Sequence, residues 1–227
     1  MRRLLNPTVA LITFFIGVFA ASIWLIVQHQ GFQKSEVSPV PLSANSIPPQ
    51  INPKIEKYAV YAALIKDMYA EDRIKLLVIG RETGCVTPSD NEKVEEMRSQ
   101  MESYAIKELP ELKHETLADF RVKAKECHSL DKQLDIPIKY VLVTDKEIEP
   151  LFPKGELDRA WRRFYSKYPD SSGILGFSNV GFNREMNQAL VATSKSCGGL
   201  CGAGYYVLLT KENGIWKVHS KVMTWVS

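Results

Sequence analysis

The chain has 227 residues, of which 45% are apolar and 24% are charged. These proportions are typical of a globular protein and exclude a disordered chain, a collagen and a membrane protein with many spans. The net charge of +3 is unevenly placed: residues 1–53 contribute +2, and residues 54–227, with 26 bases and 25 acids, contribute +1. So small an excess of bases gives no support for nucleic acid as a partner.

Residues 8–27 are uncharged, and sixteen of these twenty residues are apolar. As a helix this segment is about 30 Å long, which matches the hydrocarbon core of a bilayer. Arg2 and Arg3 precede it, so we expect a cytoplasmic tip over 1–7 and a single-span transmembrane anchor. The alternative is a secretory signal cleaved after Val18-Phe19-Ala20. Both interpretations place the remainder of the chain outside the cytoplasm.

Residues 28–53 contain five of the twelve prolines. Proline at this density opposes helices and sheets and favours an extended chain. We interpret the segment as a semi-stiff linker, with a docking strip for a partner as the alternative. The remaining residues, 54–227, are long enough for one domain with a single core.

The first part of this domain has helical periodicity, and we expect helices over about 54–70, from Thr87 to Pro110, through Leu117 and Phe120, and over 157–168. Ile55, Met97 and other apolar residues at this spacing mark the expected buried faces. Two short apolar runs, 75–79 and 138–143, predict strands.

After Ser172 the apolar period changes to two, which predicts strands over 173–182, 188–194, 205–210 and 215–225. Asn213-Gly214 between the last two indicates a hairpin, because both central residues of that turn need positive φ. The predicted fold class is therefore α+β: an N-terminal transmembrane helix, a helix-rich half, and an antiparallel four-stranded meander. A curved, cone-like sheet that encloses a pocket is one form of such a fold.

The four cysteines are Cys85, Cys127, Cys197 and Cys201. Outside the cytoplasm thiols tend to oxidise, and four cysteines permit three pairings. We favour Cys197–Cys201, a small loop with two internal glycines, together with Cys85–Cys127; the alternative is four free thiols. A redox site is disfavoured because the spacing is CxxxC and a strand follows.

Two other kinds of ligand site are disfavoured in these segments. A metal site from Cys127, His128 and the 197/201 pair lacks the usual zinc-ligand spacing. The glycines near residue 200 precede a strand, whereas a phosphate loop precedes a helix. We therefore expect neither a metal nor a cofactor.

The ligand-binding candidates are Tyr205, Tyr206 and Trp216, aromatic residues of the predicted sheet, and Asn183, a polar residue after a glycine that suggests a bulge. Arg159, Arg162, Arg163 and Lys167 accompany aromatic residues on one predicted helix. Such a pattern can bind an anionic lipid or a cell-envelope polymer, but core packing with a solvated basic face explains the same spacing.

Signatures of common enzyme classes are missing from the sequence: it contains neither a GxSxG nor an HExxH motif. Asp145 and Glu147 follow a predicted strand, a position at which catalytic carboxylates occur. Acid–base catalysis would need one of them to be desolvated, and a solvated cluster at a helix start is the simpler interpretation.

The C-terminal half contains several distinctive motifs: Trp161-Arg-Arg-Phe-Tyr-Ser-Lys-Tyr-Pro169, Ser178-Asn-Val-Gly-Phe-Asn183, Gln188-Ala-Leu-Val191, Cys197-Gly-Gly-Leu-Cys-Gly202, Gly204-Tyr-Tyr-Val-Leu-Leu209, Trp216-Lys-Val218 and Trp225-Val-Ser227. In these the chain resembles an uncharacterised family of predicted exported or membrane-anchored bacterial proteins. The resemblance implies a bacterial source and an extracytoplasmic domain, and it implies no activity.

The sequence thus predicts a membrane-anchored extracytoplasmic domain that binds a ligand or a cell-envelope protein or polymer. An envelope-polymer hydrolase using carboxylates near Asp145 and Glu147 is the first alternative. A structural or assembly domain is the second.

Overall fold

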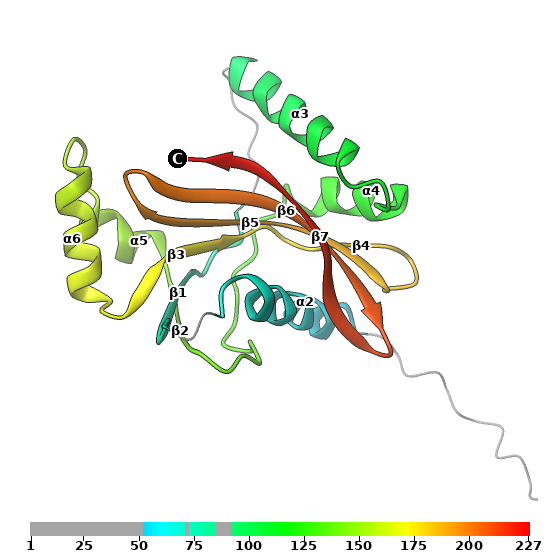
Figure 1. The fold of residues 1–227 in the computed structure, drawn as a ribbon, viewed down its shortest axis with the longest axis horizontal. Helices are drawn as coiled ribbons and strands as arrows, with labels where there is room; N and C mark the ends of the chain where they lie inside the picture. The colour runs from blue at the N-terminus through cyan, green and yellow to red at the C-terminus, as the bar shows by residue number, and fades with distance from the viewer. Residues whose placement is uncertain (1–51, 71–72, 85–91) are drawn as a thin grey trace, which may run out of the picture. The chain divides into compact units, whose positions relative to one another are not determined.

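The computed structural model describes residues 52–70, 73–84 and 92–227, which all lie in a compact unit from Gln50 to Ser227 (Figure 1). The α-helices of these residues are α2 (Pro53–Met68), α3 (Glu92–Lys107), α4 (His114–Lys123), α5 (Asp145–Ile148) and α6 (Leu157–Lys167), with a 3₁₀ turn at Glu149–Leu151. The strands are β1 (Leu76–Gly80), β2 (Lys139–Val143), β3 (Ser171–Phe177), β4 (Gly181–Phe182), β5 (Gln188–Gly198), β6 (Cys201–Glu212) and β7 (Ile215–Val226).

The seven strands of the described residues form one mixed sheet in the order β2-β1-β3-β5-β6-β7, with the short β4 paired to β5. β1 is parallel to both β2 and β3. All pairings from β3 to β7 are antiparallel. The helices between β1, β2 and β3 serve as crossovers, as parallel strands require.

Helix α2 covers one face of the sheet (Figure 1). Asn52 caps its N-terminus by accepting a hydrogen bond from the Lys54 backbone N–H (3.0 Å), and Pro53 is the first helical residue. The side chains of Tyr61 and Leu64 are fully buried against this face. The strand residues of the same cluster include Leu77, Ile79, Leu175, Phe177, Val191 and Leu209.

Helices α3, α4 and α6 cover the opposite face. Leu190 and Leu208 contact α3 and α4, and they alternate with the neighbours that contact α2. Phe164 of α6 packs on Val78 of β1, and with Val143 of β2 these residues form a second cluster on this face. The central strands are therefore covered on both faces, whereas most side chains of β7 are exposed or half-buried.

The predicted fold class is wrong. In place of a four-stranded antiparallel meander, the structure has a seven-stranded mixed sheet with helices on both faces. β1 and β2 belong to the same sheet as the meander because they pair in parallel through β3. Because helices pack on both faces of this sheet, it is not a cone closed around one helix.

The membrane anchor of the predicted fold lies outside the described residues, since the apolar segment covers 8–27. In the part of the chain that the structure describes, no helix is both long enough and apolar enough to span a bilayer.

Several predicted elements need correction in detail. The single strand expected over 173–182 is divided into β3 and β4, and β5 and β6 continue to the turn near residue 200. The side chains of Ile55 and Met97 are 65% and 52% exposed, so the expected buried faces of their helices were wrong at these positions. The helix start expected at Thr87 falls outside the described residues.

Candidate functional site

A groove of about 430 Å³ lies beside α2. One wall is the outer side of α2 from Ile55 to Lys66, and the other is the turn between β6 and β7, with Ile215 and Trp216. The eleven-residue separation from Ile55 to Lys66 corresponds to about 16 Å of helix. Its remaining lining residues are Tyr58, Ala59, Ala62, Ala63, Gln133, Asp135 and Gly214. The lining is mostly apolar, with a few polar groups, as is typical of binding sites.

Two isoleucines stand at the walls of this groove and face solvent. Ile55 is 65% exposed and Ile215 is 63% exposed. Three alanines between them make the α2 wall low, because they carry no side chain beyond Cβ. The groove therefore offers apolar surface that no described part of the chain covers.

The β6–β7 turn is held in place by its backbone conformation. Asn213 and Gly214 have φ values of 50° and 82°, as the two-residue hairpin turn requires. The turn sets Ile215 outward and Trp216 inward, since successive strand residues point to opposite faces.

A polar network joins this hairpin to α2. The Glu56 carboxylate accepts hydrogen bonds from Trp216 Nε1 at 2.6 Å and from Lys211 Nζ at 2.7 Å. The Lys211 and Glu56 side chains are 20% and 13% exposed, so this ion pair is largely withdrawn from water. It fixes Trp216, and hence one wall of the groove, against α2.

β7 is an edge strand of the sheet, since β6 is its one neighbour among the described strands. Its pairing with β6 contains two register shifts, and the exposed Lys217 and Lys221 lie along it. Bulges and lysines on an edge disfavour the addition of a further strand. A partner at this end of the sheet would therefore be held by side chains in the groove.

Of the four predicted ligand-binding residues, Trp216 lies in this groove. Tyr205 packs against the core on the α2 face, whereas Tyr206 lies on the opposite face, edge-on to Phe120 at 5.6 Å between ring centroids. As neighbours on one strand they cannot converge on one ligand.

Asn183 holds the turn before β5. Its Oδ1 accepts hydrogen bonds from the backbone N–H groups of Asn187 (3.0 Å) and Gln188 (2.8 Å), and its Nδ2 donates to Glu185 and Asn187. Because Asn183 is 2% exposed and its polar side-chain atoms are hydrogen-bonded within the turn, its role is to stabilise the turn.

Asp145 and Glu147 lie at the start of α5, directly after β2. Glu147 Oε2 accepts hydrogen bonds from the Thr144 backbone N–H (2.8 Å) and hydroxyl (2.9 Å), and the first of these belongs to a capping box. The bond from the Thr144 backbone N–H is the main cause that lowers the pKa of Glu147. A general acid needs the opposite shift.

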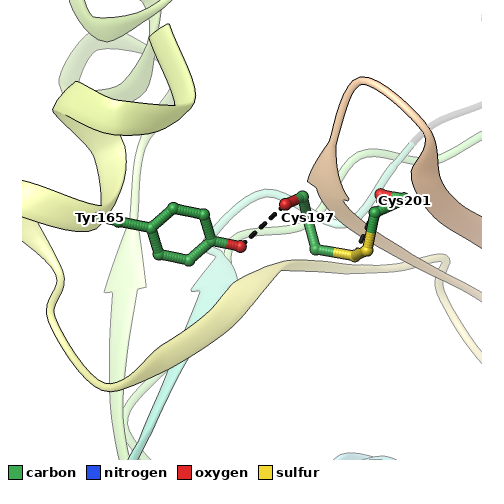
Figure 2. The surroundings of a disulfide bond; sticks show 3 residues. All are labelled: Tyr165, Cys197 and Cys201. Atoms are coloured by element: carbon green, nitrogen blue, oxygen red, sulfur yellow. Dashed lines mark hydrogen bonds between the residues drawn. A yellow bond between two sulfur atoms is a disulfide. The ribbon is translucent and has the colours of Figure 1, made fainter. Parts of the chain in front are cut away.

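A disulfide joins Cys197 and Cys201, the pair that the spacing favours (Figure 2). Tyr165 of α6 donates a hydrogen bond from its hydroxyl to the Cys197 carbonyl at 2.9 Å, which ties this turn to the helix. Cys127 is also disulfide-bonded, and Cys85, its expected partner, lies outside the described residues.

Within the ranges that the structure describes, no group of three or more His, Cys, Asp or Glu side chains is placed to hold a metal ion. Comparison with known proteins gives no match: no family model, no curated protein and no solved structure corresponds to this chain. The resemblance to a bacterial family therefore stays a prediction, and function is inferred from the groove itself.

Sequence reasoning missed the isoleucines of the groove. Ile55 fits the apolar spacing of α2, and only the structure shows that no described segment covers it. The exposure of Ile215 could have been predicted from the sequence. A large aliphatic residue directly after a tight Asn-Gly turn lies at a hairpin tip, which is exposed to solvent.

Proposed function

We propose that residues 50–227 are an extracytoplasmic binding module of the bacterial cell envelope, whose groove beside α2 receives an apolar polypeptide segment of a partner. The observation that carries this proposal is the uncovered apolar groove with exposed Ile55 and Ile215 at its walls. Exposed apolar surface of this kind marks interaction sites in soluble domains.

A helical segment fits the groove better than an added strand. The edge of β7 is protected by bulges and lysines, so backbone pairing is disfavoured. A side-chain groove along a helix is the usual receptor for the apolar face of an amphipathic helix, with anchors at i, i+3, i+4 and i+7. Two turns of such a helix span about 11 Å, less than the α2 wall.

The extracytoplasmic location is supported by the uncharged segment 8–27 after Arg2 and Arg3, and by the Cys197–Cys201 disulfide. Binding is favoured over hydrolysis because the Glu147 carboxylate is engaged by Thr144 and its pKa is lowered.

The test is a selection of random twelve-residue peptides on the purified chain, followed by affinity measurement with Ile55→Asp and Ile215→Asp variants. Val122→Asp is the matched control, because Val122 is 62% exposed on α4, away from the groove. We expect enriched peptides with apolar anchors at helical spacing. Loss of one buried aliphatic contact, worth about 1.5–3 kcal/mol, should weaken them roughly ten- to a hundredfold.

The control should bind the same peptides as tightly as the unmodified chain does. Peptides that bind both groove variants and the control equally, or a selection without apolar enrichment, would contradict the proposal. Circular dichroism of each variant checks that the substitutions leave the fold intact.

A further inference from the structure

A second surface, independent of the groove, lies at the opposite end of the β6 strand. Here the turn between β5 and β6 meets helix α6 (Figure 1). The turn, the start of α6 and β7 carry exposed apolar side chains, and α6 carries a concentration of positive charge.

Leu200 at the apex of this turn is 92% exposed, the most exposed large apolar side chain of the described residues. Its position is fixed, because the Cys197–Cys201 disulfide closes the turn and Tyr165 binds the Cys197 carbonyl (Figure 2). A rigid turn that holds a leucine in solvent gains nothing for the core. Such an arrangement suits an apolar side chain that inserts into a lipid layer.

Two further apolar side chains accompany Leu200. Leu157, at the start of α6, is 52% exposed and lies against Gly199, where a Cβ would be 3.3 Å from its Cδ2. Trp225, 37% exposed, lies over Gly202 just after the turn, where a Cβ would be 3.0 Å from its ring. Leucine and tryptophan are among the residues that enter the interfacial region of a bilayer.

The outer side of α6 is basic. Arg159, Arg162, Arg163 and Lys167, with Ser166, line an open hollow of about 530 Å³. Residues 154–167 carry five bases (Lys154, Arg159, Arg162, Arg163 and Lys167) and two acids (Glu156 and Asp158), a net charge of +3. Since residues 54–227 together carry +1, the rest of that range is at −2.

This charge is only partly compensated within the domain. Glu156 pairs with Arg159 at 3.6 Å and with Arg163 at 3.0 Å. Lys167 Nζ lies 3.4 Å from the Glu147 carbonyl oxygen, and Arg162 makes no ion pair with any described residue. The buried side of the same helix is aromatic, with Trp161 and Phe164.

We propose that the basic side of α6 and the disulfide-closed turn with Leu200 form a membrane-docking surface for anionic phospholipid. The arginines and Lys167 meet headgroup phosphates, while Leu200, Leu157 and Trp225 enter the interfacial layer. The turn and α6 contact each other through Tyr165 and Leu157, so their apolar and basic residues lie at the same end of the sheet. Proteins that lie on a bilayer combine basic and apolar residues in this way. A soluble polyanion would use the charges but would have no use for the exposed leucines.

The test uses the full chain with the photoreactive residue p-benzoylphenylalanine in place of Leu200, or in place of Val122, an exposed aliphatic residue of α4, as the control. Each protein is reconstituted with vesicles of phosphatidylcholine containing 30% phosphatidylglycerol, irradiated, and analysed for lipid adducts. We expect at least fivefold more lipid adduct at position 200 than at position 122. The excess should vanish in vesicles of pure phosphatidylcholine.

A charge variant, Arg159→Gln with Arg162→Gln, should lower the adduct at position 200 at least fivefold, since each basic residue near an anionic surface strengthens binding about fivefold. Lys107→Gln with Lys125→Gln, two exposed lysines elsewhere, is the control pair and should leave it unchanged. Both variants must keep the thermal midpoint of the unmodified chain. Equal adducts at positions 200 and 122, or an adduct insensitive to phosphatidylglycerol or to the arginines, would overturn the proposal. Binding of soluble polyphosphate without lipid adduct would overturn it in favour of a polymer.

Discussion

Substitution of Glu56 by alanine tests the network that holds the groove. The Glu56 carboxylate is the acceptor for Trp216 Nε1 at 2.6 Å and for Lys211 Nζ at 2.7 Å. Trp216 is 5% exposed, so its indole N–H has no ready access to water once the carboxylate is removed. The Lys211 side chain is 20% exposed and can turn partly toward solvent.

The expected loss of unfolding free energy follows from these two donors. An unsatisfied buried N–H costs about 1–3 kcal/mol, and a hydrogen bond to a charged group contributes about 1.5–3 kcal/mol. Because Lys211 can recover some hydration, we expect Glu56→Ala to destabilise the domain by about 2–4 kcal/mol. Lys211→Met in the same background should then cost less than it does in the unmodified chain.

A second ion pair of similar length, but exposed to solvent, provides the control for the effect of burial. Glu212 binds Lys217 at 2.8 Å, but these side chains are 57% and 59% exposed. Exposed ion pairs contribute little to stability, so Glu212→Ala should leave the urea midpoint within error of the unmodified chain. Equilibrium urea unfolding, followed by circular dichroism, measures both variants. A loss below about 1 kcal/mol for Glu56→Ala, or equal losses for the two variants, would refute this reasoning.

Three further predictions concern the rest of the fold. Gly181→Ala places a Cβ against the α4 backbone and should cost about 1–3 kcal/mol or more in urea unfolding, whereas Gly84→Ala, whose Cβ would lie 3.9 Å from its nearest neighbour, should not destabilise. Replacing Cys197 and Cys201 by serine should lower the unfolding free energy by about 2 kcal/mol under oxidising conditions, and an unchanged urea midpoint would contradict a contribution from the disulfide. Burial raises the pKa of Tyr61, so the unfolded chain loses that proton first and stability should fall as pH rises above about 10; Tyr61→Phe should flatten this dependence of the thermal midpoint.

Local elements were predictable because their signals are local. The helix expected over 157–168 is α6 (Leu157–Lys167), and its aromatic and basic sides follow from spacing alone. The Asn213-Gly214 hairpin was likewise predictable, since few residues other than asparagine and glycine adopt positive φ in that turn.

The pairing of strands was not predictable from local pattern. β1 pairs in parallel with β2, and about sixty residues lie between the two strands in the sequence. Its sequence, Leu-Leu-Val-Ile-Gly, is nearly continuous in apolar residues, which is typical of a parallel strand buried on both faces. That composition was the available signal for parallel pairing, although it does not specify the partner strand.

The groove was only partly predictable for a related reason. Trp216 could be selected from its type, but the groove is made by α2 and the β6–β7 turn, about 150 residues apart. The spacing of apolar residues places Ile55 on the apolar side of α2. Whether its side chain is exposed depends on which other segment of the fold covers it. Contacts of this kind are a property of the tertiary fold.

The most direct test of the central claim is amide hydrogen exchange of the chain with and without a peptide from the selection. Binding in the groove predicts slower exchange in α2 over 55–66 and in the β6–β7 turn over 212–217, with α3, α4 and α6 unchanged. Protection confined to the helices on the opposite face, or no protection near Ile55 and Ile215, would contradict the assignment of the groove as the binding site.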